Sequence, residues 1–428
     1  MKSTGITFIS LLTLLLSACS QGPASMDELA ERYVKLVLAL GEHDSGYVDA
    51  YYGPDSWVTD AKKMNLSAQQ IAGQAKQLHQ QLAALVDNDE EMEKLRGHYL
   101  DRQLVALQAH ANAIASGKRA AFDSQSQSLY DTVAPTHAFE HFAQPLAELE
   151  ALLPGDAPLN QRVETFLMQF YIPREKQDAV FARAIEECRS RTKAHIQLPM
   201  HENFTLEYVQ DKPWSGYNWY QGNAQSLIQL NVELPIEISR AVDLGCHEGY
   251  PGHHTYNALL ENNLVNEKGW LEFSVYPLYS PQSLIAEGSA NYGIELAFPG
   301  EQKEQFERDV LFPLAGIDPQ LAEQYAEFNR LKAELSYASN EVARQYLAGT
   351  LPAEKAIELL QTYSLYSPEK AAQRIRFFDT YGAYVINYNW GKDLVKDYVE
   401  QAKSEDERWQ RFARLLASPR VPSSIFWN

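Results

Sequence analysis

One short segment, which places three histidines beside a glutamate, constrains this 428-residue chain more than any other. From residue 244 to residue 254 it reads LGCHEGYPGHH. Protein zinc sites are built from neutral imidazole nitrogens and carboxylate oxygens, and a hydrolytic zinc needs a nearby carboxylate that takes a proton from water. His247 supplies a first candidate ligand, and Glu248 supplies such a carboxylate. The segment therefore predicts a metal site with its own general base, and Zn2+ is the cofactor we expect.

The second ligand cannot lie where a regular helix would place it. In the familiar His-Glu-x-x-His pattern the two histidines are one helical turn apart, but here Pro251 occupies that position. A helical proline lacks an N–H group for the carbonyl four residues earlier, and its ring collides with that carbonyl, which belongs to His247. Gly252 then permits backbone angles that are closed to other residues. We expect a kink or bulge that makes His253 the second ligand and turns His254 toward the substrate or a developing oxyanion, although these two roles are exchangeable.

The third ligand has to come from another part of the chain, and Glu287 is the best candidate. Small residues around it, among them Gly288, would let its helix approach a neighbouring helix closely. Glu295, two turns further on, is the reserve candidate. Asp243 and Asn291, each one turn from a candidate ligand, are placed to orient the ligands by hydrogen bonds.

The first residues read as a targeting signal. An apolar run over residues 6–16 is too short to span a bilayer and leads into Leu-Ser-Ala-Cys, which ends at Cys19. We interpret residues 1–18 as a bacterial lipoprotein signal peptide, Cys19 as the acylated residue and residues 19–25 as a tether. An ordinary secretory signal with an incidental cysteine is the alternative. Ser20 favours sorting to the outer membrane, where the chain would face the periplasm.

Most of the remaining chain carries helical signals. Capping boxes begin several helices, the first at Ser25, and a Pro-Gly-Asp-Ala-Pro run at residues 154–158 marks the clearest break. No repeat or linker divides the chain. We therefore predict one mainly α-helical domain over residues 26–428, with an N-terminal helical part at 26–153 and a metal-site part at 154–428.

Only residues 204–209 and 226–232 alternate apolar and polar side chains in the manner of strands. A small sheet directly before the metal-site helix would offer an edge with which an extended peptide can pair. We take Ile228 and Leu230 as candidate substrate contacts. A hairpin that merely packs on helices is the open alternative.

Two further cysteines, Cys188 and Cys246, belong to a compartment in which disulfides can form. Each lies in a predicted helix, and buried thiols are common in protein cores. We expect two unpaired core cysteines.

The histidine string, the Glu287-Gly288 pair and the lipoprotein-type start together resemble the bacterial family called domain of unknown function 885, which is itself similar to the zincin metallopeptidases. The match is close only in the string and the Glu-Gly pair. The resemblance implies a helical, cleft-containing, gluzincin-like fold. It implies that His247, His253 and Glu287 are the zinc ligands. Glu248 corresponds to the base.

The chain departs from that family in two places. Ser289 follows the Glu-Gly pair where relatives often carry a bulky aromatic residue, and residues 381–391 replace a Pro-Gly-Gln-Ala-type segment. Zincin-type hydrolysis needs a donor for the tetrahedral oxyanion. Tyr384, Tyr388 and Arg376 are the candidates, and Arg376 is also a candidate substrate contact. Aromatic packing and a surface charge are their alternative roles.

These features predict a zinc hydrolase of the peptidase type. Glu248 would take a proton from the attacking water and return it to the leaving amine of a peptide or related amide. The alternative is a non-catalytic lipoprotein that binds peptides or cell-wall fragments, but structural zinc sites usually have four protein ligands and this chain offers three.

The formal net charge of −19 argues against nucleic-acid and anionic-membrane partners, because the chain has no basic run that would release counterions from phosphate. We expect a peptide or amide substrate, membrane contact only through the lipid anchor, and a monomer.

Overall fold

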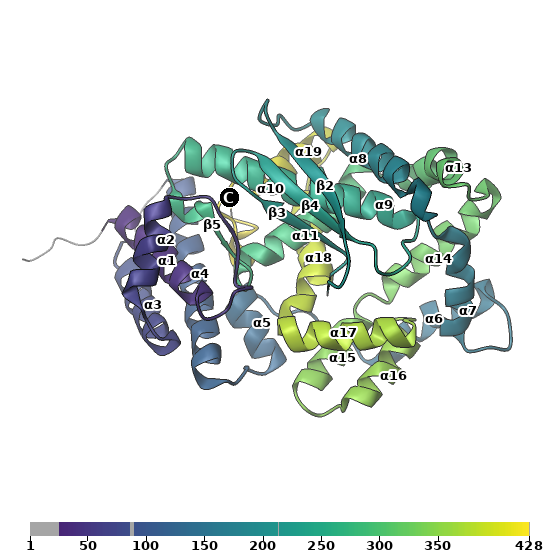
Figure 1. Ribbon diagram of the computed structural model, residues 1–428, viewed down its shortest axis with the longest axis horizontal. Coiled ribbons are helices and arrows are strands. Elements are labelled where there is room, and N and C mark those ends of the chain that lie inside the picture. Colours follow the sequence, from purple (N-terminus) through teal and green to yellow (C-terminus); the bar gives the residue numbers. More distant parts are fainter. Residues whose placement is uncertain (1–24, 86–89, 213, 428) are drawn as a thin grey trace, which may run out of the picture.

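The computed structural model describes residues 25–85, 90–212 and 214–427 (Figure 1). Within these ranges the chain is mainly α-helical with two small sheets, which confirms the predicted fold class. The predicted signal peptide and Cys19 lie outside the described residues. No helix in the described ranges is both long enough and apolar enough to cross a bilayer.

The N-terminal helices lie together at the left and lower left of Figure 1, except the last of them, which lies at the right. They are α1 (Met26–Gly41), α2 (Asp55–Met64), α3 (Ala68–Leu82), α4 (Glu91–Ser116), α5 (Phe122–Tyr130) and α6 (Ala143–Leu152). The capping box predicted at Ser25 is confirmed, since its hydroxyl accepts from the Glu28 amide at 3.2 Å and the Glu28 carboxylate accepts from the Ser25 amide at 3.0 Å. Helix α4 ends at Gly117, which has a φ of 65°.

The rest of the chain adds further helices around the same hydrophobic core. They are α7 (Leu159–Leu167), α8 (Gln177–Lys193), α9 (Ser239–Leu244), α10 (His253–Leu260), α11 (Pro281–Ala297), α12 (Gln302–Phe306), α13 (Phe312–Ala315), α14 (Ala322–Glu334), α15 (Ala338–Leu347), α16 (Ala353–Tyr363), α17 (Pro368–Tyr381), α18 (Ile386–Val399) and α19 (Glu405–Leu416). Within the described ranges, three segments are π-helical turns: Gly245–Gly249, Glu261–Asn266 and Glu307–Leu311. Short 3₁₀ segments are Phe139–Phe142, Met168–Phe170, Arg174–Lys176, Leu271–Ser274, Pro319–Leu321, Gly382–Val385 and Pro422–Ser424.

A three-stranded sheet lies near the centre of the view, with α8 and α10 beside it (Figure 1). Its strands are β2 (Asn203–Val209), β3 (Gly216–Tyr220) and β4 (Gln225–Asn231), in the order β2-β4-β3. β4 pairs with β2 in parallel and with β3 in antiparallel orientation. Both predicted strands are therefore confirmed, but β4 is central, and β2 and β3 are the two edge strands.

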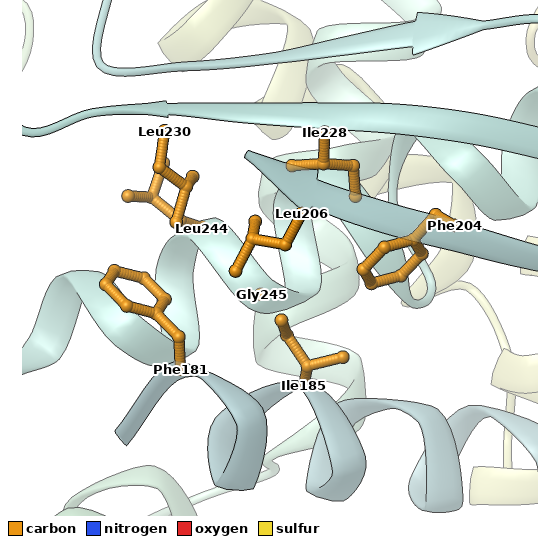
Figure 2. Close-up of a pocket in the computed structure, with 8 residues that line it drawn as sticks. All are labelled: Phe181, Ile185, Phe204, Leu206, Ile228, Leu230, Leu244 and Gly245. Atoms are coloured by element: carbon orange, nitrogen blue, oxygen red, sulfur yellow. The ribbon is translucent and has the colours of Figure 1, made fainter. Parts of the chain in front are cut away.

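The expectation that Ile228 and Leu230 contact an edge-bound peptide is wrong. Both side chains are almost fully buried, at 3% and 2% exposure. They point from β4 toward α8 and α9 and surround a small apolar cavity of about 10 Å³, where their neighbours include Phe181 and Leu244 (Figure 2). Because β4 has a strand on each side, its apolar residues fill the core beneath the sheet.

A second sheet consists of β1 (Val48–Tyr51) and β5 (Val275–Pro277), which pair in antiparallel orientation. The sequence did not predict these strands. Each has only three or four residues, and the partner of β1 lies more than two hundred residues away, so no local alternation marks the pair. This sheet ties the N-terminal helices to the segment that precedes α11.

Candidate metal centre

The helix that carries His247 ends soon after it. His247 lies in the π-helical turn Gly245–Gly249, and α10 begins afresh at His253. The Gly252 amide donates to the Cys246 carbonyl at 3.0 Å, and a Cβ on Gly252 would lie 1.8 Å from the His247 carbonyl oxygen. Only glycine fits so close to a backbone oxygen. The predicted interruption at the proline–glycine step is confirmed, and it is a full break between two helices.

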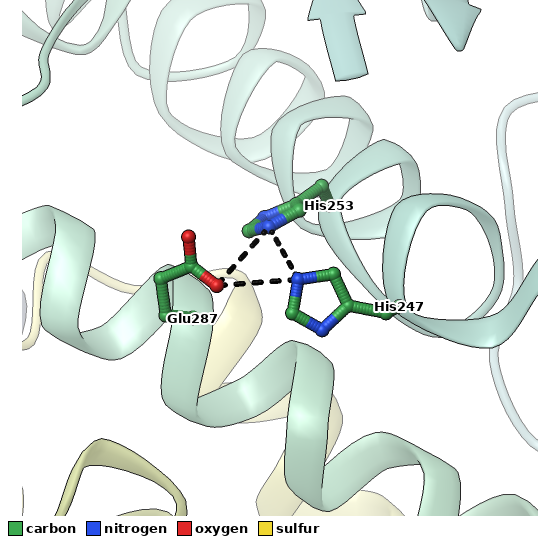
Figure 3. Close-up of side chains that lie close together, drawn as sticks. All are labelled: His247, His253 and Glu287. Atoms are coloured by element: carbon green, nitrogen blue, oxygen red, sulfur yellow. Dashed lines mark hydrogen bonds and ion pairs between the residues drawn. The ribbon is translucent and has the colours of Figure 1, made fainter. Parts of the chain in front are cut away.

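The break brings His253 beside His247, and α11 brings Glu287 to the same point (Figure 3). The two Nε2 atoms lie 3.1 Å apart. Glu287 Oε2 lies 3.2 Å from His247 Nε2 and 3.7 Å from His253 Nε2. In a tetrahedral zinc site with bonds of about 2.0–2.2 Å, ligand atoms lie about 3.3–3.6 Å from one another. The three separations therefore fit the predicted ligand set.

The carboxylate of Glu287 points to a cation for a second reason. Its Oε1 accepts a hydrogen bond from the Tyr384 hydroxyl at 2.8 Å, whereas its buried Oε2 accepts none. Burial by itself would raise the pKa of Glu287, but the adjacent His247 and His253 outweigh burial and hold the pKa well below its usual range. An ionised oxygen that accepts no hydrogen bond thus faces two ring nitrogens. These three atoms form a set of ligands that suits a divalent cation.

Asn291 fixes the orientation of His247, as the sequence predicted. Its Oδ1 lies 3.1 Å from His247 Nδ1, and its Nδ2 donates to the Tyr388 carbonyl at 3.0 Å. Because the amide is anchored in this way, its oxygen accepts the proton on Nδ1 and leaves Nε2 free to bind a metal.

Two other acidic residues have different partners from those we predicted. Asp243, expected to orient a ligand, accepts from Lys303 Nζ at 2.6 Å. Glu295, the reserve ligand, pairs with Lys392 at 2.6 Å and Lys396 at 2.8 Å. Neither is part of the three-residue group at the centre.

The predicted close approach of α11 to another helix is confirmed. A Cβ on Gly288 would lie 2.3 Å from the Gly391 carbonyl oxygen of α18. Helix α18 crosses α11 at this point, and the contact fixes the turn of α11 that presents Glu287.

Glu248 lies beside the candidate ligands and is only 4% exposed. Its Oε1 is 4.0 Å from His247 Nε2. Burial raises the pKa of Glu248. The edge strand β3 lies against it: Asn218 Nδ2 donates to the Glu248 carbonyl at 2.7 Å, and a Cβ on Gly216 would lie 2.8 Å from Oε1. The base predicted from the sequence is therefore next to the candidate ligands and next to β3.

His254 does not face the centre, so its predicted contact with substrate or oxyanion is wrong. It is 1% exposed, its Nδ1 lies 2.8 Å from Ser226 Oγ, and its Nε2 lies 3.2 Å from Glu202 Oε2. Successive side chains on a helix point about 100° apart. Because His253 begins α10 facing Glu287, the next residue points under the sheet.

Of the candidate oxyanion donors, Tyr388 is the one left available. The Tyr384 hydroxyl is taken up by Glu287, so Tyr384 holds a ligand in place instead. Among described residues none hydrogen-bonds the Tyr388 hydroxyl, and burial and Glu287 raise its pKa, which keeps the proton needed for donation. Arg376 is exposed, and the cation that acts on Tyr388 is Arg374, so the predicted substrate contact of Arg376 is not supported.

The sequence missed Asp49, which lies on β1. Its carboxylate accepts a hydrogen bond from the Tyr217 hydroxyl of β3. Burial raises the pKa of Asp49 to about 7, while His253 lowers it and the nearby Glu287 and Glu248 raise it further. Asp49 therefore reaches the metal centre from the N-terminal half, through a short strand that local patterns do not reveal.

The two cysteines expected to be free form a disulfide. Cys188 on α8 and Cys246, directly before His247, have Cα atoms 5.4 Å apart, a separation typical of disulfides. The expectation failed because α8 packs side by side with the π-helical turn. The bond ties that turn to α8.

No family model and no curated protein matches this chain. Solved structures with a similar fold include a protein provisionally described as a lipoprotein from Colwellia psychrerythraea, with a TM-score of 0.53 and 16% identity over 84% of this chain and 68% of that chain. A second such protein, from Shewanella oneidensis, gives 0.46 and 14% over 86% and 75%. An M32 carboxypeptidase from Deinococcus radiodurans gives 0.44 and 14% over 91% and 87%. At these identities the chain shares with the Colwellia protein a fold and nothing finer.

Proposed function

We propose that this chain is a zinc-dependent hydrolase that cleaves peptide or related amide bonds. The observation that carries the proposal is the group of His247, His253 and Glu287 with the buried carboxylate of Glu248 beside it. Three protein ligands leave a fourth position for water or substrate, as in catalytic sites and unlike most structural sites. The resemblance of the histidine string to zincin peptidases supports the same conclusion.

When bound, the ion lowers the pKa of a water molecule and polarises the carbonyl that is attacked. Glu248 takes the proton of the attacking water and returns it to the leaving amine. Its raised pKa suits both transfers, because a base with a pKa nearer neutrality also acts as an acid. The Tyr388 hydroxyl, which is protonated and free, donates to the developing oxyanion.

The edge strand β3 is suited to hold an extended peptide beside Glu248. The Ser215 carbonyl and the Gln221 amide bond to β4. Backbone groups alternate in direction along an antiparallel strand, so those of Gly216 and Asn218 point away from β4. A peptide paired there would run past the base. This assigns to β3 the role that the sequence had suggested for β4.

We also propose that Cys19 anchors the chain to the outer membrane, facing the periplasm. The lipoprotein-type signal supports this placement, and so does the description of the similar Colwellia protein. The substrate would then be a periplasmic peptide or amide.

Substitution Glu248→Gln tests the catalytic role. Zinc-loaded protein without the signal peptide is assayed on a library of fluorogenic peptides. We expect turnover to fall by roughly 10²–10⁴-fold, the usual contribution of a general base, while elemental analysis still finds about one zinc per chain. Glu295→Gln removes the same charge from the surface of α11 and should leave turnover unchanged. Unchanged turnover in Glu248→Gln would contradict the mechanism, and absence of zinc uptake by the wild type would favour the non-catalytic binding protein.

A further inference from the structure

The disulfide between Cys188 and Cys246 lies beside the main chain that carries two candidate ligands. Cys246 immediately precedes His247, and its carbonyl oxygen accepts from the amide of Gly252 at 3.0 Å. Gly252 in turn immediately precedes His253. One residue therefore holds the main chain next to both histidines, through a peptide bond on one side and a hydrogen bond on the other.

The main chain around these ligands receives little support from regular helices. Helix α9 ends at Leu244, the π-helical turn follows it over Gly245–Gly249, and α10 begins only at His253. Tyr250, which follows the turn, has extended dihedral angles, with φ −127° and ψ 118°. Where the hydrogen bonds of a helix are interrupted, the position of the chain depends on contacts with other elements.

Helix α8, which carries Cys188, makes such contacts. Ile185, one turn before Cys188, packs against Gly245, where a Cβ would lie 3.3 Å from Ile185 Cγ1 and 3.4 Å from its amide nitrogen (Figure 2). Arg191, one turn after Cys188, donates to the carbonyl of Ala297 at 3.0 Å, at the end of α11. Helix α8 therefore lies against the π-helical turn and is hydrogen-bonded to α11, two of the elements that supply candidate ligands.

A zinc site tolerates little movement of its ligands. Ligand atoms have to lie within about 0.2 Å of their ideal distances, and a site whose ligands are ordered only when the ion binds loses affinity through that ordering. Packing and hydrogen bonds alone allow a segment to open locally. A covalent bond between α8 and the π-helical turn opposes such opening and orders the turn before the ion arrives.

Formation of this bond depends on the surroundings of the chain. Each thiol gives up its proton, and two electrons pass to a disulfide of an exchange partner, which leaves as two thiols. Disulfides persist in oxidising compartments such as the bacterial periplasm, whereas thiols are kept reduced in the cytosol. Both cysteines are fully buried, so a reductant reaches the bond in the folded chain only when the turn separates from α8.

We propose that the Cys188–Cys246 disulfide positions the metal centre, and that the centre reaches its full zinc affinity only after exchange with another disulfide has oxidised the two thiols. The inference rests on the proposed function in one respect, the binding of zinc by the three candidate ligands, and it does not require hydrolysis. It couples metal loading to export, because a chain that is still reduced takes up zinc more weakly than an oxidised one.

Zinc affinity of the double variant Cys188→Ala/Cys246→Ala tests the proposal without any substrate. Both thiols are removed so that neither binds zinc itself, and competition with a chromogenic chelator measures the affinity. We expect it to fall at least about tenfold relative to the oxidised wild type, the usual contribution of groups that support metal ligands. Leu78→Ala, in the buried core of α3, is the control: it lowers stability by opening a cavity, and the zinc affinity of the folded protein should not change.

The wild type provides a second measurement, which remains valid if the double variant does not fold. A phosphine reductant is used at a concentration that reduces the zinc-free protein, and mass spectrometry after alkylation follows the release of thiols with and without zinc. Coupling between two sites is reciprocal, so we expect zinc to slow the reduction at least about fivefold, the lower end of typical couplings. In His253→Ala, which lacks one candidate ligand, zinc should give no protection.

Several results would overturn the proposal alone: equal zinc affinity in the double variant and the wild type, or equal rates of reduction with and without zinc. An equal loss of affinity in Leu78→Ala would also overturn it, because the disulfide would then act only through overall stability. Zinc uptake without hydrolysis would remove the proposed function and leave this proposal standing. No uptake of zinc by the oxidised wild type would remove both.

Discussion

His253 and His254 are neighbours in the chain, yet they belong to two polar regions built in opposite ways. His253 turns toward His247 and Glu287, where two Nε2 atoms face each other at 3.1 Å and a buried carboxylate oxygen lacks a donor. His254 turns under the sheet, where both of its ring nitrogens meet protein partners. The polar atoms of the first region need a further atom as their partner, whereas the ring nitrogens of His254 already have partners within the protein.

The buried region shows what a structural histidine needs. Glu202 is 5% exposed and accepts from Arg189 at 2.5 Å, from the Tyr250 hydroxyl at 2.5 Å and from His254. Buried polar groups are stable when all of them are hydrogen-bonded. By this standard the unsatisfied oxygen of Glu287 marks function, because a protein gains no stability by leaving it without a partner.

The largest expected effect is the difference between replacing His253 and replacing His254 by alanine. His253→Ala should prevent zinc uptake and abolish hydrolysis, because two ligands hold zinc far less tightly than three. His254→Ala should retain about one zinc per chain and lose roughly 2–4 kcal/mol of stability, the cost of breaking a buried hydrogen-bonded network. Elemental analysis and urea unfolding measure the two outcomes. Zinc loss in His254→Ala together with zinc retention in His253→Ala would reverse our assignment.

The sequence predicted the group of His247, His253 and Glu287 because the signals for its members are local. Pro251 and Gly252 are adjacent, and helix geometry alone requires a break between His247 and the next ligand. Glu287 was identifiable because a helix rich in small residues can approach another helix, and Gly288 does meet α18.

The parts that the sequence did not reveal depend on contacts between distant segments. Asp49 reaches the centre only because β1 pairs with β5, and Cys188 meets Cys246 only because α8 lies beside the π-helical turn. The role of His254 depends on the direction in which its side chain points from α10. The residue at which α10 begins decides that direction. Helix starts are the least certain feature of a sequence-based assignment.

The second prediction concerns the pH dependence of the buried region. Burial by itself would raise the pKa of Glu202, but His254, Tyr250 and Arg189 outweigh burial and lower it from 4.5 to about 2. A lowered folded-state pKa stabilises the protein above the unfolded-state value, and this contribution is lost as the pH falls from about 4.5 to about 2. Each pKa unit corresponds to about 1.4 kcal/mol, so the contribution is roughly 3 kcal/mol.

Urea unfolding of the wild type and of Glu202→Gln at several pH values measures that contribution. The variant should be less stable near neutral pH, and the difference should shrink as the solution is acidified through this window. Glu207→Gln, at an exposed position of β2, the strand that begins directly after Glu202, is the matched control and should follow the wild type. A stability difference that does not change with pH would show that Glu202 acts only through packing.

The smallest expected effect concerns the hydrogen bond by which Tyr384 holds the candidate ligand Glu287 in place. Tyr384→Phe removes the hydroxyl that donates to Glu287 Oε1 and leaves the ring in its aromatic surroundings. Groups that orient metal ligands typically contribute 10–100-fold to metal affinity, and we expect about tenfold because the second carboxylate oxygen is untouched. Competition with a chromogenic zinc chelator measures it. Tyr381→Phe, whose ring lies 6.0 Å from that of Tyr384, is the control. Equal zinc affinity in both variants would mean that α11 alone positions Glu287, and the centre would then depend on helix packing more than on hydrogen bonds.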